Sequence, residues 1–223
     1  MNVLIVLAHP ERKSFNGALF DQACATLAAQ GHEVQTSDLY RMNFDPRSDT
    51  ANFLNRKNPE YLKLQIEEMH ATESGGFAPE LDQEMRKLEA ADLLILQFPL
   101  WWFGLPAILK GWVDRVFAMG RVYGGGRFYE NGVFRGKRAM LSVTTGGPEA
   151  AYLRGGFNGD IYSILRPIHR GVLQFVGFEV LAPSLFYSPA HVDDVQRQSW
   201  LAGYGKRLEN IAAEPVIEVG PYT

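Results

Sequence analysis

The chain has 223 residues, 46% of them hydrophobic and 21% charged, a composition typical of a globular domain with a substantial core. A formal net charge of −3 disfavours nucleic-acid binding and electrostatic docking to a membrane, and no apolar run approaches the length of a membrane span. The single Cys24 excludes an internal disulfide, and the amino terminus lacks the basic region of a signal peptide, so a cytoplasmic protein is expected.

Apolar segments that indicate strands alternate with helical patterns along the chain. Strands are predicted at residues 2–8, 33–38, 92–97, 138–144 and 179–186. Helices are predicted at residues 17–30, 80–90, 106–116, 161–175 and 192–210, with a shorter one at 59–70. Five strands with intervening helices imply right-handed crossovers and a doubly wound α/β parallel sheet with helices on both faces.

Two connections are longer than the rest. Residues 41–79 are largely polar, and residues 120–137 are rich in glycine and aromatic side chains. We expect one domain over residues 1–212 that carries both segments as insert loops, followed by a C-terminal tail at 213–223.

The turn after the first strand separates two classes of nucleotide-binding protein. A dinucleotide-binding unit carries Gly-x-Gly-x-x-Gly at this place, whereas the first glycine here is Gly17. The loop instead offers Ser14 and Asn16, which can bond phosphate oxygens together with the backbone N–H groups that begin the next helix. Either side chain could simply cap that helix, and a capped helix terminus can also face an anion.

Three large aromatic residues follow the third strand. Trp101, Trp102 and Phe103 stand between that strand and the helix predicted from Pro106. Ligands bind at the carboxyl ends of strands in open α/β sheets, so these rings suggest a flat, conjugated ligand. Simple core packing is the alternative reading.

The loop after the fourth strand is rich in small residues. Thr144, Thr145, Gly146 and Gly147 would let backbone amides approach a ring and hydrogen-bond its edge, although a glycine-rich turn is also a common feature. Phosphate-type, aromatic and amide-rich loops thus follow strands one, three and four. This plan matches a flavodoxin-like fold of strand order 2-1-3-4-5, in which flavin binds where the strand order reverses.

The sequence resembles the NAD(P)H:quinone oxidoreductase (DT-diaphorase) family of flavodoxin-like proteins. The resemblance is carried by LIVLAHPERKSFN (4–16), SDLYRMNFDP (37–46), LEAADLLILQFPLWWFGLPAILKGWVDRVF (88–117), LSVTTGG (141–147) and FVGFEVL (175–181). It implies non-covalent FAD, NAD(P)H as co-substrate, and a homodimer whose active sites lie at the subunit interface. It also implies a ping-pong mechanism, in which nicotinamide and quinone occupy the same place in turn.

The resemblance assigns cofactor contacts residue by residue. The FAD pyrophosphate and neighbouring groups would contact His9, Ser14, Phe15 and Asn16. The isoalloxazine ring would contact Pro99, Leu100, Trp101, Trp102 and Phe103. The ring edge would contact Thr144, Thr145, Gly146 and Gly147, and the adenine end would meet Arg197 and Leu201.

The resemblance also assigns the catalytic side of the site. Tyr152 matches the family tyrosine beside the flavin, and Asn158 stands where the best-known members carry histidine. An asparagine donates a hydrogen bond but holds no proton near neutral pH, so relay of a charge through an imidazole is in doubt. The acceptor would contact Trp102, Phe103, Tyr123, Phe128 and Asn158.

Two further departures from the family affect the same pocket. Trp101 replaces a glutamine, and Gly125 replaces a second tyrosine in the 120–137 loop, which suggests a more open pocket. His169 and His191 have no partner at metal-ligand spacing, so no metal is expected and both are interpreted as structural or surface histidines.

Three functions compete at this stage. A two-electron reductase of quinones or similar electrophiles is favoured by the aromatic wall. A flavodoxin-like carrier of single electrons is disfavoured, because such carriers usually have a strongly acidic docking face and the net charge here is only −3. The third is a flavin-binding regulatory subunit, since relatives of the family bind and gate potassium-efflux transporters. No nucleic acid and no stable membrane insertion are expected.

Overall fold

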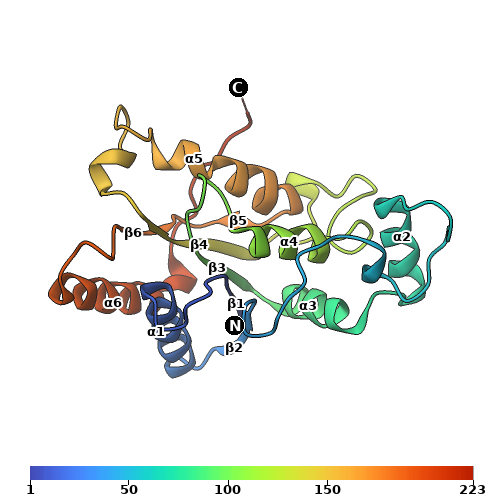
Figure 1. Ribbon diagram of the computed structural model, residues 1–223, viewed down its shortest axis with the longest axis horizontal. Coiled ribbons are helices and arrows are strands. Elements are labelled where there is room, and N and C mark those ends of the chain that lie inside the picture. The colour runs from blue at the N-terminus through green and yellow to red at the C-terminus, as the bar shows by residue number, and fades with distance from the viewer. Residues whose placement is uncertain (223) are drawn as a thin grey trace.

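The computed structural model describes residues 1–222, which form a twisted parallel sheet between two layers of helices (Figure 1). The strand order is β2-β1-β3-β4-β5, and β6 also pairs with β4. The strands are β1 (Asn2–Leu7), β2 (Glu33–Asp38), β3 (Leu93–Pro99), β4 (Arg138–Thr145), β5 (Glu179–Val180) and β6 (Ser184–Tyr187). The predicted order 2-1-3-4-5 holds except that two strands, β5 and β6, share the last place beside β4, and the flavodoxin-like α/β architecture is confirmed.

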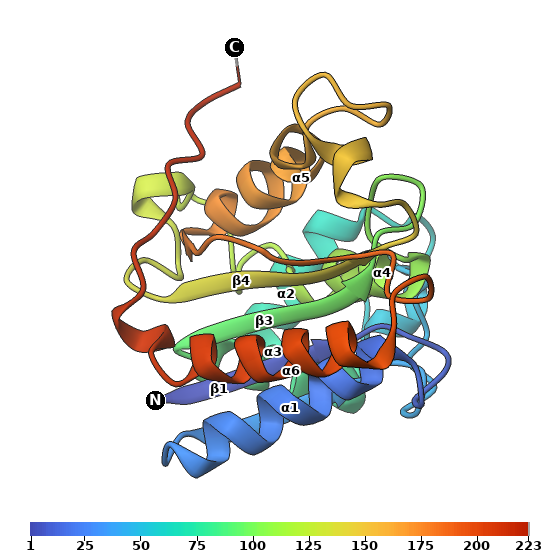
Figure 2. The same cartoon turned by 90° about the vertical axis from the view of Figure 1, so that its left-hand side faces the viewer.

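The helices divide between the two faces of the sheet. They are α1 (Phe15–Ala29), α2 (Leu64–Ser74), α3 (Pro79–Ala90), α4 (Ala107–Val116), α5 (Ile161–Ile168) and α6 (Asp194–Leu208). Helices α1 and α6 lie side by side below the sheet in Figure 2, whereas α5 lies above it. Helix α2 belongs to the first insert and lies at the far end of the molecule from α6 (Figure 1).

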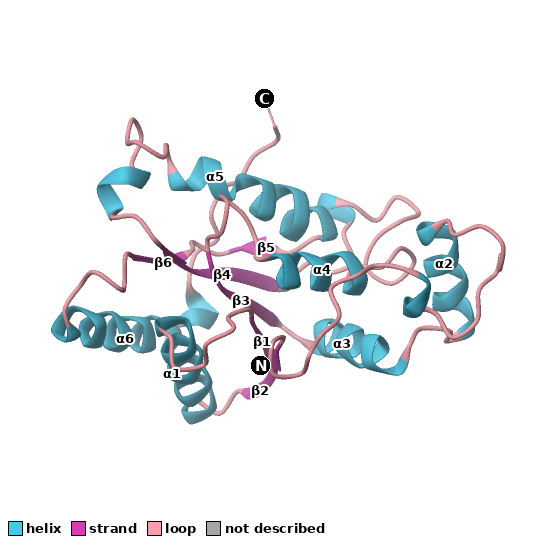
Figure 3. Ribbon diagram, in the orientation of Figure 1, coloured by secondary structure: helices cyan, strands magenta, loops and turns pink. Residues whose placement is uncertain are grey.

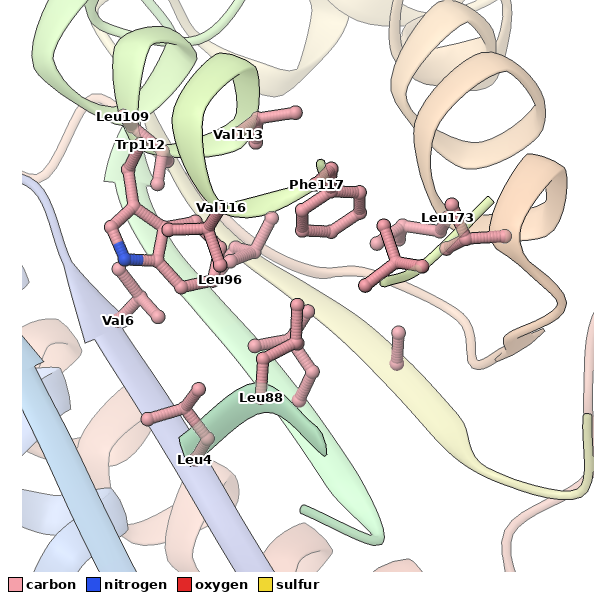
Figure 4. Close-up of a cluster of buried hydrophobic side chains, with 14 of the residues drawn as sticks. Leu4, Val6, Leu88, Leu96, Leu109, Trp112, Val113, Val116, Phe117 and Leu173 are labelled. Carbon is pink, nitrogen blue, oxygen red and sulfur yellow. The ribbon is translucent and has the colours of Figure 1, made fainter. Parts of the chain in front are cut away.

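The sheet is buried on both faces, which explains its continuous apolar runs. In β3, Leu94 and Leu96 belong to the core beneath α3, α4 and α5, whereas Leu93 and Ile95 belong to the core beneath α1 and α6. Figure 4 shows the first of these cores, where Trp112 of α4 packs over the strands. Fully burying one such side chain contributes about 2 kcal/mol, so this core holds the strand ends firmly in place.

The predicted fifth strand is wrong in one respect, because residues 179–186 form two short strands. Val180 of β5 pairs with Ala139, and pairing resumes only where Ser184 of β6 meets Ser142. Pro183 lies in the gap, and proline has no N–H to donate to a ladder. The described part of the chain therefore has six strands rather than five.

Two of the predicted helices differ from the structure by more than two residues at a boundary. The helix expected at 59–70 begins only at Leu64, because the Asn58 side chain accepts backbone N–H bonds from Glu60 and Tyr61 and makes a turn there. The helix expected at 161–175 keeps α-helical form only to Ile168 and then continues as π and 3₁₀ turns. Helical ribbon accordingly continues beyond α5 in Figure 3.

The expected C-terminal tail is described up to Tyr222, and its last residue, Thr223, lies outside the described residues. The tail packs against the edge of the sheet. Val216 forms an antiparallel bridge with Leu181, and the N–H of Ile217 donates to the carbonyl oxygen of Val180 at 2.8 Å. The tail therefore covers the sheet edge next to the break between β5 and β6.

Candidate active site

The loops that follow β1, β3, β4 and β6 meet at the carboxyl edge of the sheet, on the right in Figure 2. They enclose a cavity of about 500 Å³. Its lining consists of His9, Ser14, Phe15, Asn16, Pro99, Leu100, Trp101, Thr144, Thr145, Gly146, Ser188, Pro189, Ala190, His191 and Arg197. Eleven of these residues were predicted to contact the cofactor. Ten of them come from the segments at the carboxyl ends of β1, β3 and β4, and the eleventh, Arg197, comes from α6.

The loop after β1 presents the start of α1 to the cavity. Ser14 is the N-cap of α1, and its hydroxyl accepts the N–H of Gly17 at 3.3 Å. Ser14 also lines the cavity, so the same residue caps the helix and lies where an anion would bind. Nδ1 of His9 contacts the backbone of Glu11 at 2.9 and 3.0 Å, and this contact orients the ring.

The aromatic loop after β3 is a tight turn closed by two backbone hydrogen bonds between Trp101 and Gly104, of 3.0 and 3.2 Å. Its central residues have left-handed backbones, with φ of 50° at Trp102 and 59° at Phe103. Bulky residues rarely adopt this conformation, and such strain clusters at functional sites. Trp102 is 98% exposed and Phe103 52%, so both rings project from the turn, while Trp101 lines the cavity.

The loop after β4 groups the two residues assigned to catalysis. A Cβ on Gly147 would lie 3.2 Å from Cε2 of Tyr152 and 3.6 Å from Nδ2 of Asn158, so both side chains lie against this glycine. The hydroxyl of Thr145 donates to the carbonyl of Gly147 at 2.8 Å and holds the loop. Beside Gly146 the space is open, since a Cβ there would meet no atom within 4 Å. None of Gly147, Tyr152 and Asn158 lines the cavity itself.

Sequence reasoning missed the fourth wall of the cavity, which follows β6. Ser188 has φ of 51°, and its hydroxyl donates to the carbonyl oxygen of Gly146 at 2.8 Å. His191, interpreted from the sequence as structural or surface, lines the cavity. The available signal was positional, because the carboxyl end of the last strand meets the same edge as the others.

The two residues assigned to the adenine end differ in position. The Arg197 guanidinium lines the cavity and donates to the carbonyl oxygens of Pro189 and Val192, so it also holds the segment that closes this wall. Leu201 does not line the cavity and packs instead against the core under α1 and α6.

A second cavity, of about 720 Å³, adjoins the first and shares Gly146, Ser188 and His191 with it. Its walls include Tyr187 and Trp200. Burial raises the pKa of Tyr187 to about 12, so its hydroxyl stays protonated and remains a hydrogen-bond donor at neutral pH. The two cavities together extend the site well beyond the first one.

Tyr123 and Phe128 lie elsewhere in the single chain. Both pack on Phe175, with ring centroids 5.9 and 5.0 Å away, and neither lines the cavity. Burial raises the pKa of Tyr123, whose hydroxyl accepts from Gln65 at 3.4 Å. This chain alone therefore does not bring the 120–137 loop to its own cavity.

Within residues 1–222, no three histidine, cysteine, aspartate or glutamate side chains lie close enough together to hold a metal ion. Across the same residues, each helix is too short or too polar to cross a bilayer.

Residues 1–208 match the protein family described by a flavodoxin-like fold, so fold and site define a flavodoxin-like protein. Over 221 residues the chain is 46% identical to NAD(P)H dehydrogenase (quinone) 1 of Cavia porcellus. The aligned part is 98% of this chain and 80% of that protein. The chain is 43% identical to ribosyldihydronicotinamide dehydrogenase (quinone) of Pongo abelii, over 96% of this chain and 94% of that protein. The chain belongs to the NAD(P)H:quinone oxidoreductase family.

A solved structure extends this similarity to three dimensions. An inferred quinone reductase from Klebsiella pneumoniae superposes with a TM-score of 0.93 at 41% identity, covering 97% of this chain and 87% of that one. The backbone that positions the four loops is therefore shared with that protein.

Proposed function

We propose that this protein is an FAD-dependent reductase that transfers two electrons from NAD(P)H to quinones or similar electrophiles by a ping-pong mechanism. The observation that carries the proposal is one cavity at the carboxyl edge of the sheet that is lined together by an anion-type loop, an aromatic turn and an amide-rich loop. The relatives named as quinone dehydrogenases, which align over nearly the whole chain, support the same reaction.

The lining residues fit a flavin nucleotide. The first backbone N–H groups of α1 lack intrahelical acceptors, and they lie beside Ser14 where a pyrophosphate would bind. Trp101 supplies an aromatic wall, and the open space beside Gly146 leaves room for a ring edge. The adjoining second cavity favours FAD over the shorter FMN, because the combined site is longer than a single flavin ring with one phosphate needs.

Bound FAD would supply the chemistry, accepting two electrons from the nicotinamide and passing them to the quinone. The chain supplies position and electrostatics. Trp102 and Phe103 offer exposed rings against which nicotinamide and quinone could stack in turn. Tyr152 would donate its hydroxyl proton toward charge that grows on the reduced ring, and Asn158 would donate a hydrogen bond without titrating.

We propose further that the protein acts as a homodimer whose partner completes each site. The 41–79 insert carries Leu54, Tyr61 and Ile66, which are 59%, 63% and 47% exposed, and contact with a partner subunit would remove these apolar side chains from water. Tyr123 and Phe128, which do not reach the cavity of their own chain, would line the cavity of the other subunit and contact the acceptor there.

The deciding experiment uses the purified protein. Heat-released cofactor is separated by chromatography, and turnover is followed with NADH or NADPH and menadione as acceptor. We expect one FAD per chain and rapid menadione reduction. A pure FMN peak would contradict the cofactor, and flavin-loaded protein without menadione turnover would contradict the reaction. Accumulation of one-electron reduced flavin during reductive titration would instead indicate a carrier of single electrons.

A further inference from the structure

A buried chain of hydrogen bonds runs beneath the cavity and ends at its wall. Nε2 of Gln97, in β3, donates to Oδ1 of Asn16 at 2.8 Å, and Nδ2 of Asn16 donates to Oγ1 of Thr144 at 2.8 Å. Gln97 is 0% exposed, and Asn16 and Thr144 are each 4% exposed. The chain joins the end of β3, the first turn of α1 and the end of β4, the elements that carry three of the four loops of the site.

This chain of hydrogen bonds has a direction, because each link has a defined donor and a defined acceptor. Since Oδ1 of Asn16 accepts from Gln97, the Asn16 amide is fixed with its Nδ2 turned toward Thr144. A hydroxyl oxygen that accepts a hydrogen bond keeps its own proton for another acceptor. Within the described residues that proton of Thr144 has no acceptor in the protein, and Thr144 lines the cavity. The free donor of this hydrogen-bond chain, the Thr144 hydroxyl, therefore lies in the cavity wall.

Gln97 holds this direction at a cost in stability. Its Oε1 is buried without a hydrogen-bond partner, while Leu93 and Ile95, which precede it on the same face of β3, are apolar and fully packed. An unpaired carbonyl oxygen in the interior is unfavourable, and an apolar side chain of the same length would avoid it. The amide at this position thus serves the chain of donors rather than the packing of the core.

We propose that Gln97 is a positioning residue, which sets the direction of the Gln97–Asn16–Thr144 chain and so aims the Thr144 hydroxyl proton at an acceptor atom on the edge of the bound flavin. The inference rests on the flavin of the proposed function. Reduction places more negative charge on the ring edge, and a fixed donor stabilises that charge more than it stabilises the oxidised ring. Gln97, which touches no ligand, would thereby raise the reduction potential of the flavin.

The test measures the midpoint potential of the flavin bound to the intact protein, by equilibration with reference dyes. Gln97→Met keeps the length of the side chain and removes its donor. We expect the preference for reduced over oxidised flavin to fall about tenfold, which for a two-electron couple is about 30 mV toward negative potential. Thr144→Val should give a similar shift, and the double variant should add little, because both changes remove one donor.

Gln22→Met is the matched control. It makes the same chemical change on α1, where the Gln22 amide bonds the Thr26 hydroxyl instead of a cavity residue, and it should leave the potential unchanged. An unshifted potential in Gln97→Met would overturn the proposal, as would shifts of Gln97→Met and Thr144→Val that add fully in the double variant. If Gln97→Met does not fold, an unshifted potential in Thr144→Val overturns it equally. Failure of the proposed function is seen separately, as wild-type protein that holds no flavin.

Discussion

Tyr152 is the residue on which the proposed chemistry depends most directly. Its side chain is 7% exposed, packs against Tyr187 with ring centroids 5.9 Å apart, and lies against Gly147 together with Asn158. A phenol held in this way donates to a fixed point, and a fixed donor is most effective where charge develops.

Tyr152→Phe should slow the hydride-transfer steps by about 10- to 100-fold while FAD stays bound, because one hydrogen bond to developing charge is lost. Asn158→Ala should have a modest effect that does not vary with pH, since an amide does not titrate. Stopped-flow flavin reduction across pH measures both, with Tyr162→Phe, an exposed tyrosine of α5, as the control. Unchanged rates in Tyr152→Phe would remove this residue from the mechanism.

His169 predicts a pH dependence of stability. It is 2% exposed, its Nε2 has no partner, and burial lowers its pKa from 6.5 to about 4. Because the pKa of His169 is lower in the folded state, the free energy of unfolding does not depend on this residue above about pH 6.5, where the ring is neutral in both states. As the pH falls from 6.5 toward 4 only the unfolded state takes up the proton, and the free energy of unfolding decreases by about 3 kcal/mol in all. Urea unfolding from pH 7 to 4 should show a shallower decline for His169→Phe. Parallel curves for the two proteins would contradict this assignment.

The element that departs furthest from ordinary geometry is the turn after β3. Two bulky residues with positive φ are held by the hydrogen bonds between Trp101 and Gly104, which place the Trp102 ring in solvent. Since the ring buries almost no surface, no packing contact within the described part of the chain offsets the backbone strain. Contact of the ring with a stacked ligand or a partner subunit would offset it.

Trp102→Gly should therefore stabilise the free protein by about 1 kcal/mol, because glycine adopts this backbone without strain. The same variant should weaken use of the acceptor, seen as a raised KM for menadione. Leu153→Gly is the control, since Leu153 is 54% exposed but has an ordinary φ of −78° and should lose stability. Thermal unfolding measures both, and destabilisation of Trp102→Gly would contradict the strain argument.

At the scale of the whole molecule, the two inserts concern assembly. The first carries exposed apolar side chains far along the molecule from α6, and the second keeps its aromatic residues away from the cavity of its own chain (Figure 1). Both observations are accounted for if a second copy covers the inserts and receives Tyr123 and Phe128 in its site.

Light scattering should accordingly give twice the mass of the chain. Replacing both Leu54 and Tyr61 with aspartate should shift the protein toward monomer and lower menadione turnover with it, because charges would be buried at the interface. Val195→Asp is the control, as Val195 is 78% exposed on α6 and lies outside the inserts. A fully active wild-type monomer would contradict the shared site.

The local pattern of apolar and polar residues was sufficient to predict the sheet and much of the cavity lining. The apolar runs of β1, β3 and β4 predict buried parallel strands because both faces of this sheet are covered, and the carboxyl ends of such strands meet at one edge. Ser14, Trp101 and Thr144 lie at or shortly after the carboxyl ends of these three strands, so their positions in the sequence indicated one shared site.

Tertiary structure alone decided the remaining features, because each depends on which residues from distant segments come together. The division of the last strand at Pro183 shows only in the pairing with β4, which stops after Val180 and resumes at Ser184. Ser188 and His191 become cavity residues only because β6 lies beside β4. In the sequence, Gln97 is one polar residue in an apolar strand. Its proposed role follows from its hydrogen bond to the side-chain amide of Asn16, which lies 81 positions earlier in the chain. Hydrogen bonds of this kind have no period in the sequence, so only the fold reveals them.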